Sequence, residues 1–216
     1  MKTQPTSIEN KGDHRLFPRR PTTQENDLRE EPDQTRTAAI RTLPWALAVG
    51  LAAFLAPLGV YALTGLHTRY WADDYCFSTV LQDYNFWQAQ VVFYQTTSSR
   101  FTVIPLIGIS EFFGPGAIRW LPALNLTLLW GGFFSLLAGL ARWGKVERPR
   151  LCAALAASGL LFFLVLLAPN RLQVFYWRSG LFTYSFPLGL LAFNLAFLLR
   201  RWRQGCSADW ALALTA

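Results

Sequence analysis

Charged residues are scarce in this sequence. Only 15% of its 216 residues are charged and 52% are hydrophobic, whereas a soluble globular domain carries roughly 25% charged residues. So few charges cannot cover the surface of a folded domain in water, which excludes an ordinary soluble globular protein. The composition therefore predicts a membrane protein.

Cysteine and histidine are also scarce. The chain has three cysteines, Cys76, Cys152 and Cys206, and two histidines, and their spacing matches no metal-binding motif. The sequence therefore supports neither a disulfide framework nor a zinc site. The formal net charge of +7 does not indicate a nucleic-acid partner, because Lys and Arg gather at the cytoplasmic ends of membrane helices.

Residues 1–41 differ from the rest of the chain. They carry charges of both signs, several prolines and almost no apolar periodicity. Such a segment cannot bury enough apolar surface to offset the entropy of ordering it, which predicts a disordered tail. The tail does not resemble a cleaved signal peptide, since no apolar core lies near its start, and polar residues follow the pair Arg19 and Arg20, unlike a twin-arginine signal.

Four uncharged stretches are long enough to cross a bilayer, which needs about 20 apolar residues. They cover residues 42–66, 120–141, 151–170 and 179–199, and Arg or His brackets each of them. Because backbone polar groups in lipid must be satisfied internally, each stretch is expected to be a helix. Residues 42–216 are thus predicted to form an all-α, polytopic transmembrane bundle.

Residues 101–118 form a fifth apolar stretch, which Glu111 divides into runs too short to span a bilayer alone. If this stretch crossed the membrane, every later loop would change sides. With four spans and a cytoplasmic amino terminus, the basic loop 142–150 and the basic run 200–203 both lie in the cytoplasm, as the positive-inside rule favours. The stretch is therefore interpreted as re-entrant or interfacial, with a short crossing helix as the alternative. The expected location is the plasma or inner membrane, with residues 67–119 and 171–178 on the outer face.

The first outer loop contains a helical pattern over residues 75–95. Its apolar side chains recur at spacings of three and four, and Gln and Asp lie on the opposite side. The pattern predicts one amphipathic helix that either lies along the bilayer interface or packs against neighbouring helices. The apolar positions are Phe77, Val80, Leu81, Tyr84, Trp87, Val91 and Tyr94.

Two adjacent aspartates, Asp73 and Asp74, precede this helix. A carboxylate at a helix start accepts free backbone N–H groups, which accounts for one of the two. The alternative is catalysis, because acids with altered pKa values gather at functional sites. Glu111 is costly within an apolar stretch, so it is expected to face a cavity or to pair with an arginine, Arg100 or Arg119.

Three short motifs lie on the predicted outer face. They read ADDYCFS after the first span, YQTTSSRFT at the end of the first outer loop, and VFYWRSGLFTYSFPL at the fourth span. Together they resemble a bacterial membrane family with an Asp-Asp-Tyr motif, related to the GT-C superfamily of glycosyltransferases. The third motif matches that family's Trp-x-x-Gly-x-x-x-Tyr-x-x-Pro pattern at Trp177, Gly180, Tyr184 and Pro187. The resemblance covers about residues 40–200.

The resemblance implies a transferase that takes a sugar from a polyprenyl-phosphate donor at the extracytoplasmic surface. Asp74 would be the general base, with Asp73 supporting it or helping to hold a metal, and the two roles are interchangeable at this point. Arg100 and Arg178 would bind the leaving phosphate through their forked guanidinium groups. Some members of the superfamily use a divalent cation and others do not, and this sequence contains no decisive ligand set.

Three further residues are candidates for substrate binding. Trp177 and Tyr184 would stack on a sugar or, equally, anchor the chain at the bilayer interface. Glu111 would contact substrate or form a structural ion pair.

Chain length departs from the GT-C pattern, since those proteins usually have more than four spans. The chain ends in ADWALALTA, which looks like the start of a further helix, so a fragment or a truncated product is expected. Two other functions are compatible with the residues. One is a transporter or flippase component, in which intramembrane acids and arginines mark a substrate path. The other is a non-catalytic membrane scaffold, for which the aspartates are only a helix cap.

Overall fold

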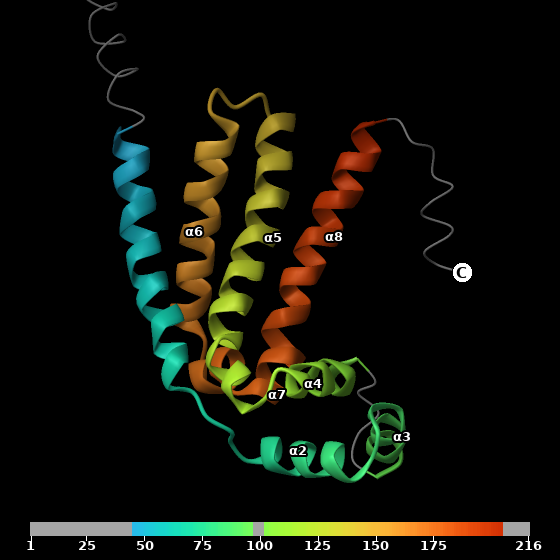
Figure 1. The fold of residues 1–216 in the computed structure, drawn as a ribbon. Coiled ribbons are helices and arrows are strands. Elements are labelled where there is room, and N and C mark those ends of the chain that lie inside the picture. Colours follow the sequence, from blue (N-terminus) through green and yellow to red (C-terminus); the bar gives the residue numbers. More distant parts are fainter. Residues whose placement is uncertain (1–44, 97–101, 205–216) are drawn as a thin grey trace, which may run out of the picture. The chain divides into compact units, whose positions relative to one another are not determined.

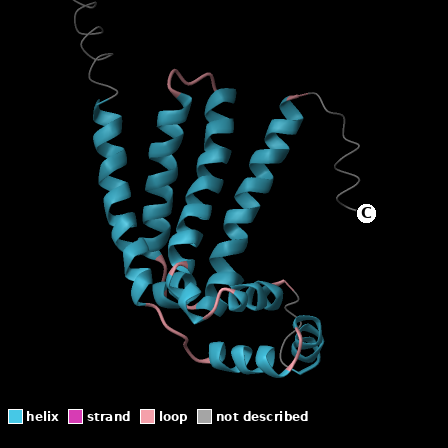
Figure 2. Cartoon of the chain, in the orientation of Figure 1, coloured by secondary structure: helices cyan, strands magenta, loops and turns pink. Residues whose placement is uncertain are grey.

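The computed structural model describes residues 45–96 and 102–204, and these form helices and connecting loops with no strand (Figure 2). The prediction of an all-α fold is confirmed for this part of the chain. The tail 1–41 and the candidate Arg100 lie outside the described residues.

Four helices in the described residues are long and apolar enough to cross a membrane. They are Trp45–His67, α5 (Leu121–Trp143), α6 (Pro149–Leu167) and Arg178–Arg203, which contains α7 (Arg178–Gly180) and α8 (Phe186–Arg203). Each overlaps one of the four stretches predicted from the sequence. Proline stands in the first turn of α5, α6 and α8, where its missing N–H costs nothing and its fixed φ favours the helix.

Helix α5 lies between α6 and α8 and packs against both (Figure 1). Its buried side chains, among them Leu126, Leu129 and Phe133, form a core with Ala157 and Leu161 of α6. The approach to α8 is closest at two glycines, because a Cβ added at Gly132 would lie 2.7 Å from the backbone oxygen of Gly189. Small residues at such positions let helix backbones approach closely, as in many membrane bundles.

Three shorter helices gather at one end of the long ones (Figure 1). These are α2 (Asp73–Asp83), α3 (Phe86–Thr96) and α4 (Val103–Phe112), and a 3-10 turn, η2 (Pro115–Arg119), leads from α4 to α5. A second core joins them through Phe77, Phe93 and Ile107 to Leu181 and Phe182 of the fourth span. With ten residues, α4 is about 15 Å long and too short to cross a bilayer core of about 30 Å.

The single amphipathic helix predicted for residues 75–95 is wrong, because the structure has two helices there. Tyr84 is extended, with φ −121° and ψ 152°, and ends α2. The Asn85 side chain then accepts the Gln88 N–H at 2.9 Å, which is the cap that starts a new helix. The break changes which side packs against the rest of the protein: Phe77 is buried, whereas Tyr84, Trp87, Val91 and Tyr94 are exposed.

The start of the fourth span is irregular. Two π-helical turns, η3 (Leu172–Tyr176) and η4 (Leu181–Ser185), flank the short α7, and Trp177 between η3 and α7 has extended backbone. A Cβ added at Gly180 would overlap the backbone carbonyl of Gln173, so only glycine lets α7 fold back onto η3. This fold-back buries Arg178 beside α2 and α4.

The Gly180→Ala substitution should destabilise the protein. The added methyl group meets backbone that cannot rotate away, so we expect a cost of at least about 2 kcal/mol. In a chain of this size that corresponds to a fall in Tm of roughly 5 °C, measured by thermal unfolding in detergent. The matched control is Gly59→Ala, because a Cβ there meets nothing within 4 Å, and its Tm should not fall. Equal losses in both variants would contradict the role given to Gly180.

Candidate functional site

Three charged side chains from different helices meet at the end of the bundle where α2 and α4 lie. Arg178 of α7 donates from Nε to Asp74 Oδ1 of α2 at 3.1 Å, and from Nη1 to Glu111 Oε1 of α4. These residues are distant in sequence, since 104 positions separate Asp74 from Arg178 and 67 separate Glu111 from Arg178. The Asp74–Arg178–Glu111 cluster therefore joins three elements of the fold.

Both carboxylate oxygens and the backbone oxygen of Asp74 accept hydrogen bonds. Its side chain is completely buried, and Oδ2 accepts the backbone N–H of Trp71 at 3.1 Å, while Arg178 also donates from Nη2 to the Asp74 backbone oxygen at 3.0 Å. The cap interpretation is wrong: α2 begins at Asp73, no side chain caps it at Ala72, and Asp74 accepts the N–H of Trp71, which precedes the helix. The same carboxylate is also the ion-pair partner of Arg178, which the sequence did not predict.

Glu111 is the more accessible acid of the cluster, with 16% of its side chain exposed. The Tyr70 hydroxyl donates to Oε2 at 2.8 Å, and the Tyr70 ring lies 4.9 Å from the Arg178 guanidinium carbon. Burial and the neighbouring Glu111 carboxylate raise the pKa of the Tyr70 hydroxyl, so it stays protonated and donates to Glu111. Glu111 was expected to pair with Arg100 or Arg119; among the described residues its ion-pair partner is Arg178.

The cluster contains two carboxylates and one guanidinium, which leaves an excess negative charge in a mostly buried place. Burial raises the pKa of the Asp74 carboxyl, and the attraction of Arg178 opposes this only in part. A charge transferred out of water is costly, and one arginine compensates two acids incompletely. The cluster is therefore able to take up a proton or to accept hydrogen bonds from a bound hydroxyl group.

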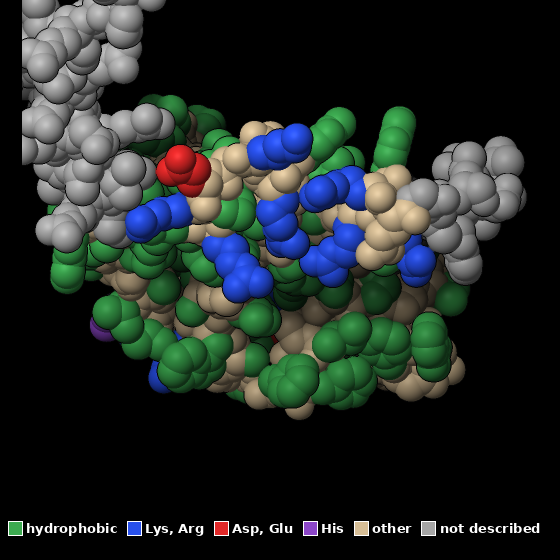
Figure 3. Space-filling model, turned by 90° about the horizontal axis from the view of Figure 1, so that it is seen from above, with side chains coloured by type: hydrophobic (Ala, Val, Ile, Leu, Met, Phe, Trp, Pro, Cys, Tyr) green, Lys and Arg blue, Asp and Glu red, His purple; other side chains and the backbone are tan. Residues whose placement is uncertain are grey.

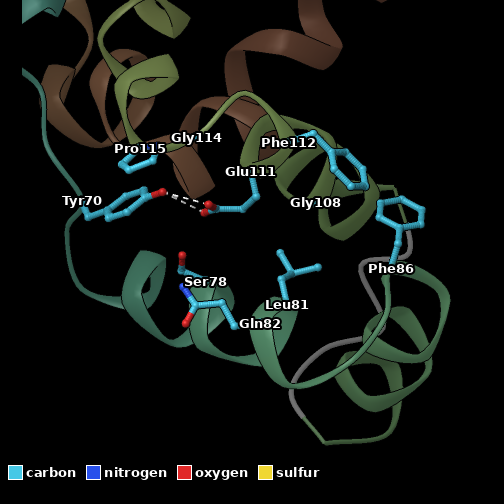
Figure 4. A pocket seen from close by; sticks show the side chains of 10 residues that line it. All are labelled: Tyr70, Ser78, Leu81, Gln82, Phe86, Gly108, Glu111, Phe112, Gly114 and Pro115. Atoms are coloured by element: carbon cyan, nitrogen blue, oxygen red, sulfur yellow. Dashed lines mark hydrogen bonds between the residues drawn. The ribbon is translucent and has the colours of Figure 1, made fainter.

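Glu111 and Tyr70 line an open pocket of about 370 Å³ between α2 and α4 (Figure 4). The Glu111 carboxylate points towards the Tyr70 hydroxyl, and Ser78 and Gln82 of α2 face it from the other side of the pocket. The walls combine these polar groups with apolar ones; the remaining lining residues are Leu81, Phe86, Gly108, Phe112, Gly114 and Pro115. Asp74 and Arg178 lie behind this wall and do not line the pocket.

A larger groove, about 850 Å³, lies on another side of α4. Its walls are mainly apolar and come from α4, α5 and the start of the fourth span, with Leu106, Leu124 and Phe186 among them. Arg119 is the one charged residue among those that line this groove. Helix α4 thus separates a polar pocket with a carboxylate from an apolar groove with an arginine.

The other predicted site residues lie outside the cluster. Asp73 is exposed in the first turn of α2. Trp177 donates from Nε1 to the Trp71 backbone oxygen at 3.2 Å and lines a third cavity of about 560 Å³ together with Arg69 and Arg171. Tyr184 is half exposed, with 50% of its surface accessible. Of the two predicted catalytic acids, the structure brings only Asp74 to the cluster.

The sequence analysis did not predict three residues that line the pocket, Tyr70, Ser78 and Gln82. Tyr70 stands four residues before Asp74, and Ser78 and Gln82 follow Asp74 at positions four and eight along α2. That spacing puts Ser78 and Gln82 on the same helix side as Asp74, which was a usable signal. No group of three or more His, Cys, Asp or Glu side chains that could hold a metal ion occurs among residues 45–96 and 102–204.

Replacing Arg178 with methionine should leave two carboxylates buried without a counter-charge. Breaking a buried ion pair by removing one partner costs about 3–5 kcal/mol, so we expect a large fall in Tm in detergent. The triple change Arg178→Met, Asp74→Asn and Glu111→Gln removes the uncompensated charges and should recover most of the loss. Arg119→Met is the matched control, since Arg119 is exposed, and should change stability by less than about 0.5 kcal/mol.

Stability should also depend on pH through Asp74. In the unfolded chain its pKa is about 3.9, and burial raises it in the folded state, so the folded protein binds the proton more tightly. The free energy of unfolding should therefore be highest below about pH 4 and fall as pH rises through the folded-state pKa of Asp74. Asp74→Asn should remove this fall, whereas Asp83→Asn, at the exposed end of α2, should leave it in place. A wild-type stability that rises over the same range would contradict the direction given.

Comparison with known proteins assigns no family to the chain. No protein-family model, no curated protein and no solved structure matches it. What the cluster and its two neighbouring cavities can do therefore follows from their own chemistry.

Proposed function

We propose that the protein is a membrane glycosyltransferase that moves a sugar from a polyprenyl-phosphate donor to a hydroxyl acceptor. The observation that carries the proposal is the pairing of two cavities across α4: a polar pocket lined by Glu111 and an apolar groove lined by Arg119. A lipid-carried sugar has an apolar chain, an anionic phosphate and a polar ring. Each of these parts finds a matching surface within one short helix of the others.

The groove suits the lipid chain of such a donor. Its volume of about 850 Å³ lies in the range of ligand cavities, and its walls are aliphatic and aromatic. Arg119 stands at the boundary between this groove and η2, where a guanidinium group binds a phosphate through two parallel hydrogen bonds. Arg178 was expected to bind the phosphate, but its guanidinium group is already paired with the Asp74 and Glu111 carboxylates. We therefore assign the phosphate to Arg119.

We assign the general base to Glu111 rather than to Asp74. The acceptor oxygen attacks the anomeric carbon, its proton passes to a Glu111 oxygen, and the bond to the donor phosphate breaks with its electron pair going to the phosphate. Glu111 lines the pocket in which an acceptor hydroxyl would lie, whereas Asp74 is completely buried. Asp74 acts through Arg178, which fixes the Glu111 carboxylate, and is thus a positioning residue.

The proposed site opens on the outer side of the membrane. It lies at the end of the bundle away from the basic loop between α5 and α6, and the positive-inside rule assigns that loop to the cytoplasm. A polyprenyl-phosphate sugar presented at the outer leaflet would reach the groove from the lipid and the pocket from water.

A transporter is the second candidate, favoured by one observation. Two π-helical turns, one just before the fourth span and one within it, flank a buried arginine, and interrupted helices with buried charges mark substrate sites in transporters. The two functions differ in whether the bond between sugar and phosphate is broken.

The test uses the full chain reconstituted in vesicles with a panel of polyprenyl-phosphate-linked radiolabelled sugars and the lipid extract of its own membrane as acceptor. The wild type should release polyprenyl phosphate and label an acceptor. Glu111→Gln should lower the rate at least about 100-fold, since a general base contributes about 10²–10⁴. Asp83→Asn, an exposed acid on the same helix as Asp74, should keep the full rate.

Three other results would contradict the proposal. Movement of the intact donor between leaflets, with no release of polyprenyl phosphate, would identify a transporter. A Glu111→Gln variant that folds with an unchanged Tm and keeps its rate would remove Glu111 from the reaction. A wild type that neither moves nor cleaves any donor of the panel would favour the scaffold.

A further inference from the structure

A second polar cavity lies at the opposite ends of α5 and α8. It has a volume of about 270 Å³, and three arginines line it: Arg142 from α5, and Arg200 and Arg203 from α8. Ser135 and Gly139 of α5 and Gln204 also line it. The cavity shares no residue with the cluster or the groove described above.

The distance along α5 places this cavity at the other membrane surface. Leu124 lines the apolar groove and Arg142 lines the basic cavity, and their separation of 18 positions corresponds to about 27 Å of helix. The hydrocarbon core of a bilayer is about 30 Å thick. A lipid headgroup of the leaflet opposite the candidate site therefore lies at the depth of the three arginines.

The arginines are arranged for an anion rather than for each other. Arg142 donates from Nε to the Ala138 backbone oxygen at 3.0 Å, which fixes the side chain against α5 and leaves its two terminal nitrogens for another acceptor. Arg200 and Arg203 stand three residues apart, on one side of α8. Among the described residues, neither Arg142, Arg200 nor Arg203 forms an ion pair with a carboxylate.

Two small residues of α5 line the cavity. Gly139 carries no side chain and faces Leu199 of α8, where an added Cβ would lie 3.0 Å from a Leu199 methyl group. Ser135 stands one turn earlier on the same side and adds a hydroxyl group. The cavity thus lies between α5 and α8, and the three arginines are among its lining residues.

A wider basic surface surrounds the cavity. In Figure 3, which looks onto this end of the molecule, Lys and Arg side chains gather over the helix ends, with one acidic group beside them. The charged residues at the adjoining ends of α5, α6 and α8 and in the loop 144–148 are Arg142, Lys145, Glu147, Arg148, Arg150, Arg200, Arg201 and Arg203. Such a surface attracts anionic lipids over the range of the Debye length, and the cavity offers a defined place for one of them.

We propose that this cavity binds the phosphate headgroup of an anionic membrane lipid in the leaflet opposite the proposed transfer site. Three guanidinium groups supply forked donors to the phosphodiester oxygens, and Ser135 and Gln204 supply neutral polar groups to the rest of the headgroup. The acyl chains continue along the apolar surfaces of α5 and α8. The binding does not depend on the transfer reaction and holds for a transporter or a scaffold as well.

The basic surface offers a matched control for this site. Arg201 belongs to the same run as Arg200 and Arg203, but its guanidinium carbon lies 5.3 Å above the ring of Phe197 and it does not line the cavity. Arg201→Gln therefore removes the same charge from the same surface without touching the proposed site.

The experiment measures retention of dioleoyl phosphatidylglycerol by the full chain in detergent, using native mass spectrometry over a lipid titration. The wild type should retain one lipid more tightly than dioleoyl phosphatidylcholine. Arg200→Gln and Arg203→Gln should each raise the Kd about fivefold, and the triple change with Arg142→Gln about 100-fold. Arg201→Gln should change the Kd less than twofold. If the triple variant does not fold, the double variant Arg200→Gln and Arg203→Gln replaces it in the titration, because it keeps the hydrogen bond from Arg142 to the Ala138 backbone oxygen.

Two results would overturn the proposal. Equal losses for Arg201→Gln and Arg203→Gln would show a diffuse electrostatic surface with no defined site. Displacement of the lipid by millimolar glycerol 3-phosphate would show that a soluble phosphate is the ligand. Both readouts are independent of sugar transfer, so failure here leaves the proposed function standing, and failure of the transfer assay leaves this site standing.

Discussion

One arginine determines how the parts of this molecule fit together. Arg178 is 2% exposed and contacts carboxylates from two other helices, so α2, α4 and the fourth span meet at a single guanidinium group. A buried charge of this kind is tolerated only when its hydrogen bonds are satisfied, and here Asp74, Glu111 and the Asp74 backbone satisfy them. The irregular segment around Gly180 brings Arg178 to these partners.

The same constraint gives the two acids different roles. Asp74 uses its oxygens on Arg178 and on the Trp71 N–H, so it organises the junction between the loop and α2. Glu111 shares the arginine but also faces a pocket with the Tyr70 hydroxyl. The chemistry proposed for the protein therefore depends on a side chain that is fixed by the ion pair without being enclosed by it.

Sequence patterns predicted the long helices well because the cause is local. Runs without charge, bounded by Arg or His, must be helical in lipid, and α5, α6 and α8 follow this rule. The break at Tyr84 and Asn85 was missed, since apolar spacing continued through it and only the cap at Asn85 signalled a new helix. Asp74, Glu111 and Arg178 were all candidates, but which arginine meets which acid depends on contacts across 67 and 104 positions that no local pattern contains.

The close approach of α5 and α8 at Gly132 and Gly189 has a mechanical consequence. Where a helix backbone lies against a neighbouring carbonyl, lengthwise sliding would drive side chains into that contact, so the two helices keep their register. A thinner or thicker bilayer must then be met by tilting the pair as one rod or by deforming the lipid. Tilt would move the apolar groove and the arginine-lined cavity together, which couples the two membrane surfaces through rigid geometry alone.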